Sequence, residues 1–184
     1  MSRIATPATI DAAPAAAQPL LAAVKKQIGV APNLFRVIAN SPAALEGYLG
    51  LNAALAKGVL APAARERIAL AVAEINGCNY CLSAHTYLGK NVAKLDDTEI
   101  AANRRGTSSD PAADAALRLA VQIVNARGHV ADIDIAAARL AGLSDAELIE
   151  IVLHVALNTL TNYVNVVAGT EIDFPAVAAA RRAA

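Results

Sequence analysis

The sequence has no tryptophan and one methionine, and aromatic residues make up only 3% of its 184 positions. Large rings therefore cannot dominate the core, which must consist mainly of alanine, leucine, valine and isoleucine, part of a hydrophobic fraction of 56%. Such side chains suit closely packed helices. Basic and acidic residues balance at 16 each, and the basic ones form no cluster larger than pairs such as Arg104-Arg105 and Arg181-Arg182. We therefore expect no nucleic-acid partner.

Charged residues are also scarce, at 17% of the chain. A soluble chain with so much apolar surface is expected to hide part of it by self-association, which predicts a homo-oligomer. The longest run without a charge, residues 151–170, is long enough to cross a bilayer. It contains His154, Asn158, Asn162 and Asn165, which favour a buried helix over a membrane span, with His154 as a hydrogen-bonded core residue.

The N-terminal segment is rich in alanine and proline, but Asp11 and scattered prolines interrupt any apolar stretch of a signal peptide. We expect a cytoplasmic protein that contacts no membrane. Residues 1–15 are predicted to form a loose arm and residues 16–184 a single domain, because the length suits one sizeable core.

Helix signals recur along the chain, while alternating runs of β-branched residues are scarce. Ser41 and Asp110 each precede a proline, which combines an N-cap with the residue favoured at the first helical position. Ser144 with Glu147 forms a capping-box pattern, and Gly142 just before it fits the end of a preceding helix. Caps and apolar positions of period 3.6 together predict eight or nine helices and an all-α fold.

Two segments resemble each other when residues 60–81 are aligned without gaps on residues 143–164. The shared leucine, isoleucine, valine and Asn-Tyr positions suggest an internally duplicated helical unit. The second segment has no cysteine where the first has Cys78 and Cys81, so it is predicted to be scaffold.

Both cysteines of the chain and one histidine are arranged at helical spacing, as Cys78, Cys81 and His85. On a helix the three side chains fall within an arc of about 60°. Asn76-Gly77 directly before them should place Cys78 at a helix N-terminus and Cys81 in its first turn, where free N–H groups and the helix dipole lower a thiol pKa. A thiolate with a second thiol one turn away permits a two-electron dithiol–disulfide cycle.

A carboxylate would be needed to orient His85 as a proton carrier near neutral pH. Glu66 and Glu74 both lie on the preceding predicted helix, and a bend at Gly77 could bring either over the thiols. The spacing alone does not choose between them.

Other interpretations of the cysteine pair have weaker support. Free cysteines are often small buried hydrophobes, and a zinc ion would have only Cys78, Cys81, His85 and one glutamate from a single knuckle, whereas structural zinc sites usually use two. A thioredoxin fold is disfavoured because the sequence around the cysteines lacks the βαβ pattern of that fold. In a reducing compartment a close pair is more often catalytic or metal-binding than structural. We expect neither a metal nor a cofactor here.

The pattern E-x11-C-x-Y-C-x3-H, formed by Glu66, Cys78, Tyr80, Cys81 and His85, resembles the core motif of the alkylhydroperoxidase D (AhpD) and carboxymuconolactone decarboxylase superfamily. The core match covers residues 61–91, the predicted redox core, and the later segment "GLSDAELIEIVLHVALNTLTNYVNVVAGTEIDFP" resembles the C-terminal part of peroxidase-related members. The resemblance implies an AhpD-like helical domain that assembles as a trimer or hexamer.

The resemblance also implies roles. Cys81 would be the thiolate that attacks organic hydroperoxides or hydrogen peroxide, and Cys78 the proton donor that then closes the disulfide. His85 with Glu66 would assist deprotonation of Cys81. Glu74 would then either support the relay residues without moving a proton itself or have a structural role. The reductant would be a thiol protein, lipoyl-bearing or thioredoxin-like.

Tyr80 departs from the best-known peroxidase of this family, which has a histidine between its cysteines. Tyrosine is a poor proton acceptor near neutral pH, so the relay is predicted to be incomplete or rearranged, with Tyr80 a possible member. The decarboxylase branch lacks the cysteine pair, which argues against lactone decarboxylation. Two rival functions remain: a redox-sensing or disulfide-exchange protein without efficient peroxide turnover, and an enzyme that acts on an unrelated small molecule.

Overall fold

The computed structural model describes residues 2–180, and these residues form helices and no strand. The prediction of an all-α fold is confirmed. A short 3₁₀ helix, η1 (Ala15–Ala17), precedes nine α-helices in this part of the chain: α1 (Gln18–Ile28), α2 (Asn33–Ile38), α3 (Pro42–Leu55), α4 (Pro62–Ile75), α5 (Asn79–Asn91), α6 (Asp97–Arg104), α7 (Pro111–Asn125), α8 (Asp132–Leu140) and α9 (Asp145–Ala168).

The predicted helix starts are confirmed by their hydrogen bonds. The Ser41 hydroxyl accepts the Ala44 N–H at the start of α3, and the Asp110 carboxylate accepts two N–H groups at the start of α7. Ser144 and Glu147 form the expected capping box of α9. Side-chain caps of this kind satisfy N–H groups that have no partner inside the helix.

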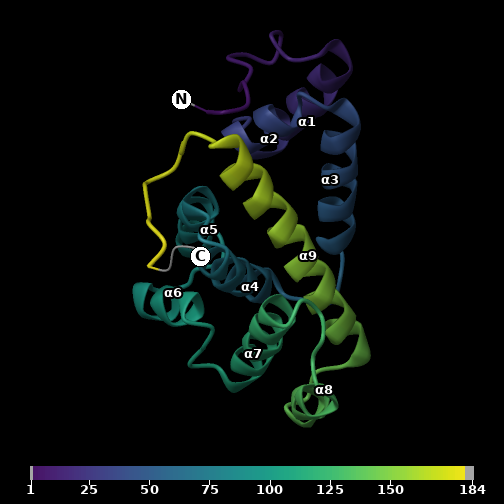
Figure 1. The fold of residues 1–184 in the computed structure, drawn as a ribbon, viewed down its shortest axis with the longest axis vertical. Helices are drawn as coiled ribbons and strands as arrows, with labels where there is room; N and C mark the ends of the chain where they lie inside the picture. Colours follow the sequence, from purple (N-terminus) through teal and green to yellow (C-terminus); the bar gives the residue numbers. More distant parts are fainter. Residues whose placement is uncertain (1, 181–184) are drawn as a thin grey trace.

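Helix α4 lies at the centre of the fold, behind α9 in Figure 1, and packs against α5, α6, α7 and α9. Every side chain from Ile68 to Ala73 is buried, which explains why this stretch is apolar on all sides rather than along one stripe. Leu70 and Ala73 join a core formed with α1, α2, α3 and α5. Ile68 and Val72 join a second core formed with α7, α8 and α9. Helix α4 therefore connects both cores.

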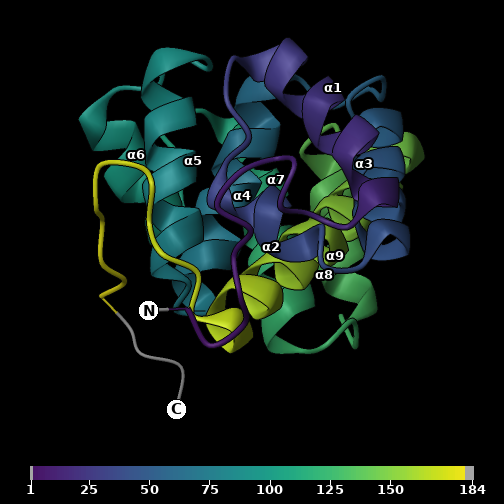
Figure 2. The same ribbon diagram turned by 90° about the horizontal axis from the view of Figure 1, so that it is seen from above.

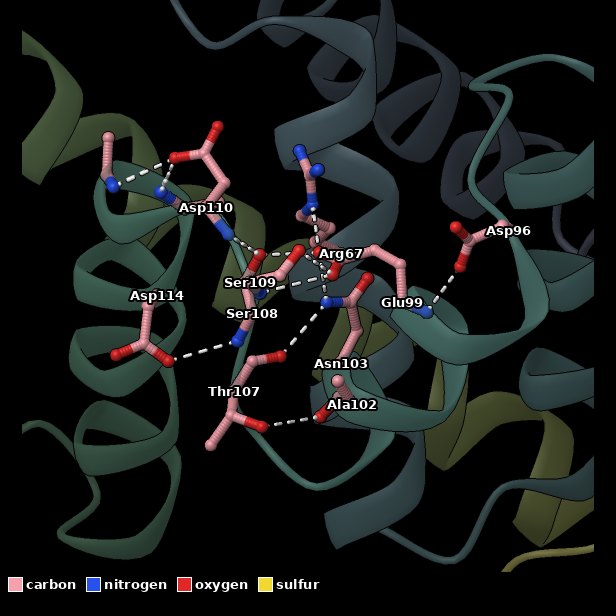
Figure 3. A network of polar contacts seen from close by, with 12 residues as sticks. Arg67, Asp96, Glu99, Ala102, Asn103, Thr107, Ser108, Ser109, Asp110 and Asp114 are labelled. Atoms are coloured by element: carbon pink, nitrogen blue, oxygen red, sulfur yellow. Dashed lines mark hydrogen bonds and ion pairs between the residues drawn. The ribbon is translucent and has the colours of Figure 1, made fainter.

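A polar network centred on Glu99 attaches α6 and the loop after it to α4 (Figure 3). The Glu99 carboxylate pairs with Arg67 on α4 at 2.9 Å and accepts hydrogen bonds from Asn103, Ser108 and Ser109. Burial opposes the charged form, but these donors together lower the pKa of Glu99 to about 2. Because this network holds Arg67, it also fixes the part of α4 that carries Glu66.

The C-terminal segment, residues 170–180, leaves α9 and runs back beside α5 and α6 (Figure 2). The Val177 N–H donates to the Ser83 hydroxyl and the Ala179 N–H to the Asn79 side chain, each at 2.9 Å. Arg104 of α6 donates to the Ala178 carbonyl at 2.8 Å. This segment therefore covers the outer side of the first turns of α5.

The predicted loose arm contains no α-helix, but it is attached to the body of the protein. The Arg3 and Ile4 N–H groups donate to the Ala168 carbonyl at the end of α9, and the Asn40 side chain donates to the Ala5 carbonyl. Ala13 is buried in the first core. These contacts could not be predicted from the sequence, because most of them use backbone groups, which leave no side-chain pattern.

Helix α9 is the one helix among the described residues whose length and hydropathy would allow it to cross a membrane, and half of its most apolar window is buried inside the protein. It contacts α2, α3, α4, α5 and α7. The two segments that align in the sequence, residues 60–81 and 143–164, differ in structure. Helix α4 ends at Ile75 and Gly77 turns the chain with φ +64°, whereas α9 continues without a break. The duplicated unit stays a hypothesis.

Candidate active site

The turn between α4 and α5 places Cys78 at the start of a helix, as predicted. Gly77 has a left-handed backbone, a conformation that glycine adopts at little cost. Cys78 is the N-cap of α5, and its Sγ accepts the Cys81 N–H at 3.2 Å. A sulfur thus occupies the position that an N-cap hydroxyl or carboxylate usually takes.

Cys81 lies in the first turn of α5 and is only 3% exposed. Its interaction with the Cys78 thiol is the largest cause that lowers the Cys81 pKa, to about 7, and it acts against the effect of burial. The nearby His85 ring and the amides of Asn165 and Asn162 lower this pKa further. The Asn165 Nδ2 donates to the Cys81 Sγ at 3.3 Å. These groups favour a thiolate at Cys81 near neutral pH.

Cys78 has the opposite tendency. Its hydrogen bond with Cys81 and its burial raise the Cys78 pKa far above that of an ordinary thiol. Both cysteines are free rather than joined in a disulfide. The reduced pair is therefore asymmetric, with the charge on Cys81 and the proton on Cys78.

The structure brings Glu66 and His85 together. The Glu66 Oε2 lies 2.8 Å from the His85 Nδ1, across the groove between α4 and α5. Burial lowers the His85 pKa, but the Glu66 carboxylate and the Cys81 thiolate outweigh it, and the net pKa is raised. No hydrogen bond joins His85 directly to Cys81 among the described residues. His85 therefore acts on Cys81 through its charge.

Glu74, the other candidate carboxylate, lies in a different place. It is buried and pairs with Arg104 at 2.8 Å, and it accepts the Ala180 N–H from the C-terminal segment. These contacts join α4 to α6 and to the chain end. Glu74 thus has a structural position.

Tyr80 lies near Cys81, but its hydroxyl is bonded to another helix. Its hydroxyl accepts the Leu34 N–H at 3.1 Å, and its ring packs edge-on against Phe174. Burial is the main cause that raises the Tyr80 pKa, and the nearby Asp173 carboxylate adds to it. Tyr80 therefore links α5 to α2 and to the C-terminal segment, and among the described residues no hydrogen bond joins it to His85.

A cavity of about 270 Å³ lies beside Cys81 and His85, between α3, α4, α5 and α9. Its volume suits a small ligand. Polar side chains line it: Asn52 from α3, Arg65 and Glu66 from α4, and His154, Asn158 and Thr161 from α9.

The residues that α9 contributes to the site were not predicted. Residues 143–164 were expected to be scaffold, yet His154, Asn158 and Thr161 of that segment line the cavity. Asn165, the next residue after it, donates to the reactive sulfur. The signal was present in the sequence: His154, Asn158, Thr161 and Asn165 recur at helical spacing inside an apolar run, on one face of a helix. That face is turned toward the thiols and the cavity.

Fold and site together define an all-helical protein with an asymmetric dithiol beside a small cavity. The described residues contain no group of three or more histidine, cysteine, aspartate or glutamate side chains placed to hold a metal. Residues 42–126 match the model of the carboxymuconolactone decarboxylase family. Together with the structural likenesses below, this match bears out the resemblance drawn from the motif: the chain is similar to AhpD-like proteins of the carboxymuconolactone decarboxylase superfamily.

Several solved structures are similar over most of the chain. The AhpD core of an uncharacterised peroxidase-related protein from Ralstonia eutropha JMP134 has 26% identity and a TM-score of 0.82, covering 94% of this chain and 92% of that one. A peroxidase-related protein from Silicibacter sp. TM1040 has 22% identity and a TM-score of 0.80, covering 92% and 91%. The debrominase Bmp8 has 20% identity and a TM-score of 0.71, covering 85% and 86%. No protein of curated function matches the sequence.

Proposed function

We propose that the protein is a thiol-dependent peroxidase that reduces organic hydroperoxides or hydrogen peroxide through a Cys78–Cys81 disulfide. The observation that carries the proposal is the asymmetry of the pair beside a cavity. The reaction uses one thiolate to attack the peroxide and one protonated thiol to give its proton to the departing alkoxide, and the two pKa values are shifted in those directions.

In the first step the Cys81 thiolate attacks the terminal oxygen of the hydroperoxide. A sulfur–oxygen bond forms, the oxygen–oxygen bond breaks, and the departing alkoxide takes the Cys78 proton to leave as an alcohol. The Cys78 thiolate then attacks the Cys81 sulfenic acid, so that a disulfide forms and hydroxide departs. Protonated His85 gives that hydroxide a proton and water leaves, which balances protons and charge. The two sulfurs lose the two electrons that the oxygens gain.

Glu66 has a supporting role in this scheme. Its carboxylate keeps His85 protonated and oriented in the resting enzyme, and the resulting cation stabilises the Cys81 thiolate. A second dithiol then reduces the disulfide by exchange. We propose a lipoyl-bearing or thioredoxin-like protein as that reductant.

We also propose that the chain works as a homo-oligomer. Helix α9 exposes apolar side chains in a strip with alternating spacings of four and three residues, which is typical of helices that pack against each other. The strip consists of Ile149, Leu153, Ala156, Leu160, Tyr163 and Val167. Leu160→Glu should lower the molar mass measured by light scattering, while Ile133→Glu, at an exposed position on α8, should not.

The test of the reaction uses fully reduced protein, tert-butyl hydroperoxide and excess dithiol, with peroxide loss and intact mass followed together. Wild type should turn over, and Cys81→Ser should not. With the dithiol left out, Cys78→Ser should consume one equivalent of peroxide and stop at a sulfenic acid that dimedone traps. Turnover that survives in Cys81→Ser would contradict the proposal. A disulfide that forms once without turnover would favour the redox-sensing function.

A further inference from the structure

Arg65 brings a positive charge to the wall of the Cys81 cavity. It lies next to Glu66 on α4 and is half-buried. Its one hydrogen bond among the described residues is a long contact of 3.4 Å to the Leu55 carbonyl at the end of α3, and no described carboxylate lies within ion-pairing distance of its guanidinium. An arginine fork presents up to five donors, so most of its capacity is unused.

Two carboxylates near this arginine accept their hydrogen bonds from other groups. Glu66 is bonded to His85 at 2.8 Å. Glu150 accepts the Val59 and Leu60 N–H groups at 2.8 and 2.9 Å. Arg65 therefore has no direct ion-pair partner among the described residues at this end of the cavity, although the charges of Glu66 and Glu150 lie nearby, and a bound anion would accept from its unused N–H groups.

His154 provides a second, independent observation at the same cavity. It is only 4% exposed, and its Nε2 has no hydrogen-bond partner among the described residues. The expected hydrogen-bonded core histidine is thus not what the structure shows. Burial and the nearby Arg65 charge lower the His154 pKa more than the Glu150 and Glu66 carboxylates raise it, which favours the neutral ring. A buried polar atom without a partner is uncommon and suggests a ligand or water that completes it.

We propose that Arg65 and His154 form the anion-binding end of the Cys81 cavity, so that the substrate is a small molecule with a carboxylate or similar anionic group at the end opposite its reacting atom. The cavity follows α9 from His154 to Thr161, seven residues or about 10 Å along the helix. This proposal names the substrate class of the proposed peroxidase and therefore rests on the same thiolate.

The test compares two small molecules that differ mainly in charge for their protection of Cys81 against alkylation. Benzoate is an anion and benzamide is neutral, and iodoacetamide reacts with the Cys81 thiolate without any peroxide. Rates are followed by intact mass with peptide mapping. In Arg65→Gln the ratio of the protection by benzoate to the protection by benzamide should fall about tenfold, as expected for one lost charge-assisted hydrogen bond. Arg65→Lys should retain most of the ratio.

The matched control is Lys57→Gln, which removes one positive charge just beyond α3 from an exposed residue that does not line the cavity. Its ratio should stay that of wild type. An unchanged ratio in Arg65→Gln, or an equal fall in both variants, would overturn the proposal. If Arg65→Gln does not fold, wild type decides: benzoate should slow alkylation by iodoacetamide more than benzamide does, and equal protection would refute an anion site.

Both measurements are independent of peroxide turnover. A protein that shows the charge selectivity but reduces no hydroperoxide would refute the proposed peroxidase and leave the anion-binding end intact. A protein that reduces tert-butyl hydroperoxide but shows no selectivity would do the reverse.

Discussion

Glu66→Gln tests whether the Glu66–His85 pair supports the thiolate. The substitution keeps the size of the side chain but removes the carboxylate that raises the His85 pKa. His85 then loses its proton near neutral pH, and Cys81 loses the cation that helps to hold its pKa near 7. Removal of one nearby opposite charge should raise the Cys81 pKa by about 1 unit, or about 1.4 kcal/mol.

The size of the effect depends on pH in a way that identifies its cause. Below the wild-type pKa of about 7 the thiolate fraction, and with it the alkylation rate, should fall roughly tenfold in the variant. Above about pH 9 both proteins are thiolates and the rates should converge. The assay is the rate of Cys81 modification by iodoacetamide between about pH 5.5 and 9.5.

Glu74→Gln is the matched control. It changes the same residue type on the same helix, but at a carboxylate that pairs with Arg104. The Cys81 titration should stay that of wild type in this variant. If Glu66→Gln also titrates like wild type, His85 does not act through Glu66 and the reasoning fails.

Three further outcomes follow from contacts described above. Asn165→Leu removes the amide that donates to the Cys81 sulfur, so the alkylation midpoint should rise while thermal unfolding changes little. Tyr80→Phe leaves the buried Leu34 N–H without its acceptor and should cost about 1–3 kcal/mol in urea unfolding, with the Cys81 titration unmoved. In Glu99→Gln the loss of unfolding free energy should reach about 3 kcal/mol at neutral pH. Because the folded pKa of Glu99 is depressed from 4.5 to about 2, its stabilisation is complete above pH 4.5, and the difference from wild type should shrink as pH falls from there toward 2.

The elements that the sequence predicted are those specified by neighbouring residues. Ser41, Asp110 and the Ser144–Glu147 box mark helix starts through contacts within three residues, and each is found in the structure. The position of Cys78 as an N-cap follows from Gly77 in the same local way. Contacts between residues that are neighbours in the chain therefore leave a pattern from which helix starts can be predicted.

The spacing left two candidate partners for His85, because Glu66 and Glu74 both suited a bent α4–α5 hairpin. The structure shows only Glu66 beside His85. The choice depends on which face of α4 meets α5, and that is set by packing. Glu74 is turned toward Arg104, which lies thirty residues later in the chain. The attachment of the N-terminal arm was missed for a related reason, since its partner, the Ala168 carbonyl, lies at the far end of the sequence.

Helix α9 shows how an apolar run can conceal a functional surface. A core helix that only packs has little use for buried amides, because each buried polar group without a partner costs free energy. Yet α9 buries Asn158, Asn162 and Asn165 on one face, and the contact of Asn165 with Cys81 joins residues 84 positions apart. The free-energy cost of burying these amides is offset where they stabilise a thiolate. Polar residues at helical spacing in a buried apolar helix are therefore a signal for a site, and the pattern around His154 belongs to that signal as much as the cysteines do.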